Sequence, residues 1–192
     1  MLAPYEAYFR LLAQWNVKIN LTGLPLQPPT DDTFDRLFIE PLAAAALVAN
    51  VPGIWFDLGS GGGSPALPLK LVRPALALTL VESKTRKAAF LREVIRALKL
   101  PATDVANVRF EELADAATKA DLVTVRAVRP DAALFNVSAR LLKGGGRLLL
   151  FGKPGTEAHH AEFEREDQTM ATEASGRILT SYTRVFHVEQ SR

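Results

Sequence analysis

The first fifty residues carry apolar side chains at the spacing typical of helices. From Tyr5 to about Ile19, apolar positions recur every three or four residues, which predicts one face of an amphipathic helix: Tyr5, Tyr8, Phe9, Leu12, Trp15 and Ile19. A glycine- and proline-containing stretch then breaks the pattern. A second, alanine-rich helix is predicted from Asp31 or Asp32, as its N-cap, through Asn50. We therefore expect residues 1–50 to form an N-terminal helical extension that packs on a main domain at residues 51–192.

From Ile54 onward, the pattern changes to short apolar runs that alternate with helical segments. The apolar runs predict strands at residues 54–58, 76–81, 107–110, 122–125 and 147–151. Helices are predicted at residues 65–72, 85–98 and 131–142, and three consecutive glycines at 144–146 are expected to stop the last one. Because strands that alternate with helices are typical of a parallel sheet, we expect five parallel strands.

The C-terminal stretch has a different pattern. A polar segment from Thr156 to about Thr172, which includes His159 and His160, is interpreted as a helix with both histidines on the surface. Two β-like runs follow at residues 177–180 and 184–188, and only residues 181–183 separate them, which predicts an antiparallel hairpin at one edge of the sheet. The expected fold class is α/β and Rossmann-like, with a seven-stranded, mostly parallel sheet.

Composition narrows the class of protein. A chain of 192 residues with 48% hydrophobic and 23% charged residues has the balance of an ordinary globular protein. It contains no cysteine, which excludes disulfides and thiolate metal sites and fits a reducing cytoplasm, and we expect no metal site. No apolar run approaches the roughly 20 residues of a membrane span, so neither export nor membrane insertion is expected. The net charge of +2 favours polyanionic partners only slightly.

A glycine-rich loop follows the first predicted strand of the main domain. It reads Asp57-Leu-Gly-Ser-Gly-Gly-Gly-Ser-Pro65, and its position at the first strand-to-helix crossover is where open α/β sheets bind ligands. Glycines at 59, 61 and 63 let the backbone turn tightly and approach a ligand. Because Ser64 replaces the third glycine of the dinucleotide fingerprint, and no Lys-Ser/Thr ending follows, a nucleotide-like ligand without phosphates fits better. A purely structural turn is the alternative.

Two carboxylates stand at the same expected edge of the sheet. Glu82 ends the second strand, where its two oxygens can accept hydrogen bonds from both hydroxyls of a ribose. Asp57 ends the first strand and could hold a ligand ammonium, directly or through water. The structural alternatives are that Glu82 caps the next helix and that Asp57 tightens the loop.

The sequence resembles the glucose-inhibited division protein B family, the 16S ribosomal RNA guanine-N7 methyltransferases. The resemblance runs through the segment Trp15 to Thr22, the glycine loop, Glu82-Ser83-Lys84, Arg109-Phe110-Glu111-Glu112 and Arg126-Ala127. It implies a class I methyltransferase fold that binds S-adenosylmethionine. It also implies that Gly59 and Ser64 contact this cofactor, that Phe110 and Glu111 flank its adenine, and that Arg126 lies between cofactor and substrate.

The chain departs from the family pattern at several places. Ser64 and Ala66 flank the loop proline where a bulky apolar residue and a glycine are usual, and Lys153 follows Gly152 where Lys-Gly is usual. The longest departure lies in the extension. Where the family usually reads Arg-His-Phe-x-Asp-Ser, this sequence has Arg36-Leu-Phe-Ile-Glu40-Pro41. The departures fall on Leu37, Glu40 and Pro41, which the resemblance places on the substrate side.

The chemistry that the resemblance implies requires no general base. Guanine N7 carries a free lone pair at neutral pH, so it can attack a sulfonium methyl group without first losing a proton. Catalysis would then come from in-line alignment and electrostatics, and Arg126 is the residue expected to act on transfer rather than on folding. As a structural residue, Arg126 would need a buried acid partner.

An RNA substrate calls for basic and polar surface residues. The candidates for RNA contact are Asn20, Arg36, Lys84, Arg109, Arg129 and Lys153. The predicted helix from Thr85 is also basic, and an ordinary solvated face is the alternative to RNA contact there. We expect a monomer that acts on 16S ribosomal RNA or a small-subunit assembly particle in the cytoplasm. A small-molecule methyltransferase and a non-enzymatic nucleotide- or RNA-binding module are the alternatives.

Overall fold

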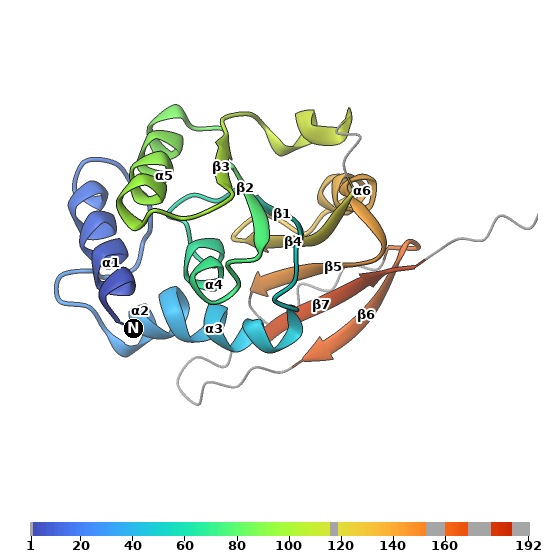
Figure 1. The fold of residues 1–192 in the computed structure, drawn as a ribbon, viewed down its shortest axis with the longest axis horizontal. Coiled ribbons are helices and arrows are strands. Elements are labelled where there is room, and N and C mark those ends of the chain that lie inside the picture. Colours follow the sequence, from blue (N-terminus) through green and yellow to red (C-terminus); the bar gives the residue numbers. More distant parts are fainter. Residues whose placement is uncertain (1, 116–118, 153–159, 169–177, 186–192) are drawn as a thin grey trace, which may run out of the picture.

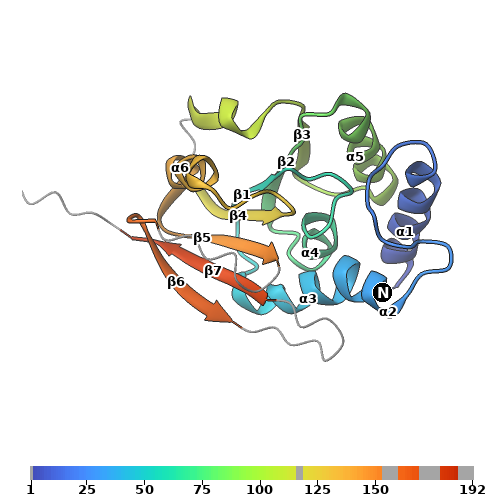
Figure 2. The same ribbon diagram turned by 180° about the vertical axis from the view of Figure 1, so that it is seen from behind.

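The computed structural model describes residues 2–115, 119–152, 160–168 and 178–185. Seven strands form one sheet in the order β3-β2-β1-β4-β5-β7-β6 (Figures 1 and 2). The strands are β1 Gly53–Leu58, β2 Leu76–Val81, β3 Thr103–Ala106, β4 Ala120–Arg126, β5 Leu142–Gly152, β6 Phe163–Gln168 and β7 Ile178–Arg184. Strands β1 to β5 are parallel, whereas β7 is antiparallel to both β5 and β6. The seven-stranded, mostly parallel α/β fold is confirmed.

Alternating residues of β1 supply two hydrophobic cores, one on each face of the sheet. Trp55 belongs to the core that includes α4 (Ala66–Val72) and α5 (Thr85–Leu98). Phe56 and Leu58 point the other way, into the core that includes α6 (Ala132–Leu141). Because β1 is covered on both faces, its carboxyl end is held at a fixed place in the middle of the sheet. No helix in the described ranges is long and apolar enough to cross a membrane.

The N-terminal extension packs on the α4 and α5 face. Helix α1 (Ala3–Asn16) lies against α5, where the rings of Trp15 and Phe90 have centroids 5.9 Å apart. The α1 helix ends three residues before the expected Ile19, because the Asn16 side chain accepts hydrogen bonds from the backbone N–H groups of Leu21 and Thr22. These bonds fold the chain back over the sheet edge.

The second predicted helix is a continuous but irregular helical segment. It consists of α2 (Asp31–Phe34), the π-helix η1 (Asp35–Ile39), α3 (Glu40–Ala44) and the 3₁₀ turn η2 (Ala45–Leu47). Thr30 caps its start by accepting from the backbone N–H of Thr33. The helix ends before Asn50, the predicted end, since Val48 is already extended.

The third strand lies earlier than the sequence pattern predicted. The prediction of a strand at 107–110 is wrong, because β3 spans Thr103–Ala106 and only Val105 is fully buried in it. Val108 and Phe110 are instead partly buried against the α6-side core, and Phe110 begins the 3₁₀ helix η3 (Phe110–Asp115). Alternate apolar residues of this loop are partly buried, so the loop shows the same sequence pattern as a strand.

The C-terminal hairpin is formed by different residues from those predicted. Strand β7 runs without interruption through residues 181–183, the predicted turn, and β6 occupies part of the predicted polar helix. Ser181 and Tyr182 are fully or almost fully buried, because β7 lies between β5 and β6 and is covered on both faces. Residues 186–188 of the predicted run lie outside the described residues.

Two predictions beside these strands also need correction. Helix α6 ends at Leu141, and the three glycines at 144–146 lie within β5 rather than in a stop after the helix. His159 lies outside the described residues, and His160 is half-buried with its ring stacked on Phe135 at 5.7 Å.

Candidate functional site

The loop after β1 is shaped by its glycines. Gly59, Gly61 and Gly63 all have positive φ, which side-chain-bearing residues rarely adopt. A side chain at Gly59 would meet Val128 at 2.7 Å, and one at Gly63 would overlap Leu67. The backbone N–H groups of Gly59 and Ser60 both donate to the Val81 carbonyl, at 2.9 and 3.0 Å, so the loop is tied to the end of β2.

Glu82 completes this connection at the end of β2. One carboxylate oxygen accepts from the backbone N–H of Gly61 at 2.9 Å, and the other accepts from the N–H of Lys84, the N-cap of α5, at 2.7 Å. Glu82 therefore supports the loop and the helix start, as the structural alternative expected. Each carboxylate oxygen has a second lone pair, so these bonds do not exhaust its capacity to accept from a ligand.

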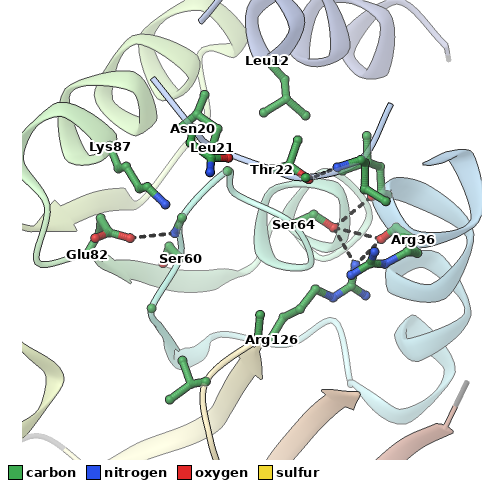
Figure 3. Close-up of a pocket in the computed structure, with 18 residues that line it drawn as sticks. Leu12, Asn20, Leu21, Thr22, Arg36, Ser60, Ser64, Glu82, Lys87 and Arg126 are labelled. Carbon is green, nitrogen blue, oxygen red and sulfur yellow. Dashed lines mark hydrogen bonds between the residues drawn. The ribbon is translucent and has the colours of Figure 1, made fainter. Parts of the chain in front are cut away.

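A cavity of about 340 Å³ lies above the glycine loop (Figure 3). Its floor is Gly59–Gly62 with Ser64, and residues 20–24 of the N-terminal extension form the opposite wall. Glu82 and Lys87 lie on one side of the cavity, and Arg36 and Arg126 lie on the other. The extension therefore contributes directly to the site.

Arg126 lies at the carboxyl end of β4 and makes four contacts. Its Nη1 donates to the Arg36 carbonyl and, at 3.3 Å, to the Ser64 hydroxyl. Its Nη2 forms an ion pair with Glu40 Oε2 at 2.7 Å, and its guanidinium lies over the Phe151 ring, 4.9 Å from the centroid. Burial lowers the pKa of Arg126 to about 10, and Glu40 opposes this shift. The buried acid partner of a structural arginine is therefore present.

A second cavity of about 450 Å³ adjoins the first across Arg126. It is lined by the strand ends Val125–Pro130 and Leu150–Gly152, together with Arg36 and Glu40. Both cavities share four residues, namely Arg36, Arg126, Ala127 and Val128. Ala127 has a φ of 59°, a left-handed conformation that is costly for alanine and that turns the chain sharply between the cavities.

Asp57 lies beneath the loop rather than in the cavity wall. Its carboxylate accepts from the Thr124 hydroxyl at 2.5 Å, and that hydroxyl accepts from the Trp55 indole N–H at 2.9 Å. The side chain is almost completely buried. Burial raises the pKa of Asp57 to about 6, although the Thr124 and Ser60 hydrogen bonds and Arg126 oppose the shift. The carboxylate thus places negative charge under the loop at neutral pH.

The structure brings together only part of the predicted cofactor set. Gly59, Gly61, Ser64, Glu82 and Arg126 all line the first cavity. Asp57 and Gly63 are buried and do not line it. Phe110 and Glu111 begin η3 and do not line either cavity, and Phe110 packs against the α6-side core.

The predicted RNA-contacting residues are dispersed. Asn20 and Arg36 line the first cavity, and Arg129 lines the second. Lys84 and Arg109 are exposed and line neither cavity, while Lys153 lies outside the described residues.

Several residues near the site were missed by sequence reasoning. The Tyr8 hydroxyl donates to the Gly62 carbonyl at 2.6 Å, and Leu12 lines the first cavity. Their helical spacing indicated a buried face, but it did not show that this face covers the glycine loop. Thr124 was assigned only to an apolar strand, although a hydroxyl within such a strand is a signal for a buried polar partner.

The lining of the two cavities limits the chemistry of the site. Within the described part of the chain, neither cavity is lined by a histidine. The described lining offers backbone groups, hydroxyls, carboxylates and the cationic side chains of Arg36, Lys87, Arg126 and Arg129. Such a site is suited to binding and aligning two ligands across Arg126.

Solved structures share the architecture. A putative methyltransferase YhhF from Escherichia coli superimposes with a TM-score of 0.60 at 18% identity, over 78% of this chain and 85% of the other. An O-methyltransferase family protein from Burkholderia thailandensis gives a TM-score of 0.62 at 15% identity, over 82% and 59% of the two chains. At these identities the similarity establishes the fold alone.

Sequence relatives are more similar. Proteins named ribosomal RNA small subunit methyltransferase G are 40% identical over 149 residues in Xanthomonas axonopodis pv. citri, and 39% over 148 residues in Stenotrophomonas maltophilia. The matched stretch covers 77% and 76% of this chain, respectively, and 66% of each relative. The family model for rRNA small subunit methyltransferase G, GidB, matches residues 1–185. The resemblance inferred from the sequence is thereby confirmed, and the chain belongs to the rRNA small subunit methyltransferase G family.

Proposed function

We propose that this protein transfers a methyl group from S-adenosylmethionine to N7 of a guanine in 16S ribosomal RNA. The observation that carries the proposal is the pair of adjoining cavities that share Arg126 at the carboxyl edge of the sheet. Ligands of open α/β sheets bind at this edge, and a transfer reaction needs two ligands whose reacting atoms meet. Family membership supports both the cofactor and the RNA substrate.

The first cavity fits the cofactor. A side chain at Gly61 would meet no atom closer than 3.7 Å, so the backbone here leaves open space toward the cavity. Glu82 would accept from the ribose hydroxyls while it retains its bonds to Gly61 and Lys84. The buried charge of Asp57 would favour the cationic end of the ligand. When bound, S-adenosylmethionine supplies an electrophilic methyl group on a sulfonium.

The second cavity would receive the target guanine. It offers the Phe151 ring and the Arg126 guanidinium, both suited to contact with the flat face of a base. Guanine N7 needs no deprotonation, which agrees with a site whose described lining has no histidine. Arg126 would help to keep the guanine N7 in line with the methyl group.

The RNA backbone would lie outside these cavities. Arg36 and Arg129 adjoin the second cavity, and Lys84 and Arg109 are exposed, so phosphates could contact them around the target base. We propose that the protein acts as a monomer in the cytoplasm, on free 16S RNA or on a small-subunit assembly particle.

The function is tested in two steps with the intact chain. Calorimetric titration with S-adenosylmethionine tests the first cavity, and a methyl-labelled cofactor with undermethylated ribosomal RNA tests transfer. We expect cofactor binding, and label that precipitates with RNA. Binding without transfer would indicate a non-enzymatic module, whereas label in small molecules of a cell extract would indicate a small-molecule methyltransferase.

A further inference from the structure

We propose that Glu40 is a positioning residue that holds Arg126 at the boundary between the two cavities. The inference rests on the proposed function, because it assigns Arg126 a part in methyl transfer. Glu40 begins α3 in the N-terminal extension and is 86 residues from Arg126 in sequence. The extension would thus align a group of the methyltransferase sheet.

The ion pair is well shielded from solvent. Its atoms are 2.7 Å apart, and the exposed fractions of the two side chains are only 12% for Arg126 and 9% for Glu40. A buried guanidinium is costly unless a charged partner compensates for its lost hydration. The other acceptors around Arg126 are neutral, namely the Arg36 carbonyl and the Ser64 hydroxyl. Among the groups that contact the Arg126 guanidinium, Glu40 therefore supplies the negative charge.

The location of Glu40 favours a role in alignment. Its side chain lines the second cavity and not the first, and the RNA proposed for this cavity is a polyanion. A carboxylate would repel phosphates unless its charge is matched by a cation. The pairing with Arg126 resolves this conflict and fixes the guanidinium over Phe151. Without Glu40, the guanidinium would keep only its two neutral acceptors and the Phe151 contact, so it would turn toward phosphates more readily and lose its alignment.

A double-mutant cycle tests this role. The variants are Glu40→Gln, Arg126→Gln and the double variant, with single-turnover transfer measured at saturating cofactor and RNA and at temperatures where each protein is folded. We expect Glu40→Gln alone to slow transfer about ten- to a hundredfold, because alignment is lost. In the Arg126→Gln background, the same change should alter the rate less than about twofold, since Glu40 acts through Arg126. Glu40→Asp should recover part of the loss.

A matched control and a second readout complete the test. Glu162→Gln removes the carboxylate partner of Arg184, 3.3 Å away in another ion pair that lines neither cavity, and should leave transfer unchanged. NMR of ¹⁵N-arginine-labelled protein should show slow rotation of the Arg126 guanidinium in the parent and faster rotation in Glu40→Gln.

The outcomes separate the two proposals. Equal slowing by Glu40→Gln in both backgrounds would overturn the positioning role, as would parental transfer or parental guanidinium rotation in this variant. If the parent itself transfers no methyl group to RNA, the proposed function fails. The guanidinium rotation then decides alone whether Glu40 holds Arg126.

Discussion

At the scale of single residues, two residues at the ligand-binding edge are expected to lower the stability of the fold. Asp57 is an ionisable group in the core, and Ala127 adopts a left-handed backbone conformation between the cavities. Both features oppose folding, and both lie at the ligand-binding edge. Unfavourable conformations and buried charges of this kind persist only where the surrounding structure holds them in place. They are concentrated at functional sites.

The Asp57 carboxyl predicts a specific pH dependence. Burial raises its pKa from 3.8 to about 6, so the folded state holds the proton more tightly than the unfolded state. The cost of ionisation is fully present above pH 6 and is relieved as the pH falls toward 4. Asp57→Asn should therefore increase the free energy of unfolding at pH 8 by up to about 3 kcal/mol, with little gain near pH 4. Denaturant unfolding at both pH values measures this, and an equal effect at both would contradict it.

Gly61 predicts a selective loss of cofactor binding. Valine at this position would project into the first cavity and occupy space proposed for the cofactor, and the φ of 51° disfavours a β-branched residue. Gly145 in β5 offers a matched control, because it has a φ of 74° and no atom within 4 Å of an added side chain. Gly61→Val should bind S-adenosylmethionine at least about tenfold more weakly, whereas Gly145→Val should bind like the parent. Calorimetry of both variants decides the assignment, and equal affinities would refute it.

At the scale of elements, the N-terminal extension is part of the site. Helix α1 reaches the glycine loop through Tyr8, and residues 20–24 line the first cavity. The irregular segment from α2 to η2 brings Arg36 and Glu40 to Arg126. The ligand-binding edge is thereby enclosed by an element that precedes the sheet in sequence.

Tyr8→Phe tests the connection between α1 and the loop. The substitution removes only the hydroxyl that donates to the partly buried Gly62 carbonyl, and loss of this bond costs about 1 kcal/mol. We expect a lower melting temperature and an affinity for S-adenosylmethionine that is several-fold weaker. Tyr5→Phe on the same helix, where the tyrosine is half-buried, is the control and should bind normally. Parental affinity in Tyr8→Phe would show that the helix does not stabilise the loop.

The success of sequence-based prediction differed between elements. Strands β1 and β4 could be predicted because their apolar runs are buried on both faces, and β2 because buried residues alternate along it. All three are bounded by glycine, proline or charged residues. The position of β3 could not, since loop residues such as Val108 also pack into the core. Strand β7 was split because Ser181 and Thr183 resemble a turn, although antiparallel pairing on both sides covers them.

Only those parts of the site that lie next to a strand in the sequence could be predicted. The glycine loop and Glu82 follow strands directly, so their positions at the sheet edge could be inferred from the sequence pattern. The contacts between Glu40 and Arg126, or Tyr8 and Gly62, join residues that are far apart in sequence. No periodicity or local motif specifies such pairs, because they depend on how the extension packs on the sheet.

At the scale of the whole molecule, two cavities, a divided core and an N-terminal extension meet at one edge of the sheet. The rate of methyl transfer should therefore depend on how the two ligands are aligned at this edge, and not on a general base or nucleophilic side chain of the protein. Arg126→Ala should slow single-turnover transfer about ten- to a thousandfold. It should also lower the melting temperature, since it removes an ion pair whose two side chains are shielded from solvent. Loss of transfer only in proportion to the unfolded fraction would return Arg126 to a purely structural role.

The most direct test of the account is the identity of the methylated nucleoside. Undermethylated 16S ribosomal RNA is incubated with the protein and S-adenosylmethionine, digested to nucleosides and analysed by mass spectrometry. The account predicts 7-methylguanosine that appears only with both protein and cofactor, and that is strongly reduced with Arg126→Ala. A methyl group on another nucleoside, or RNA that stays unmethylated although the protein binds the cofactor, would contradict it.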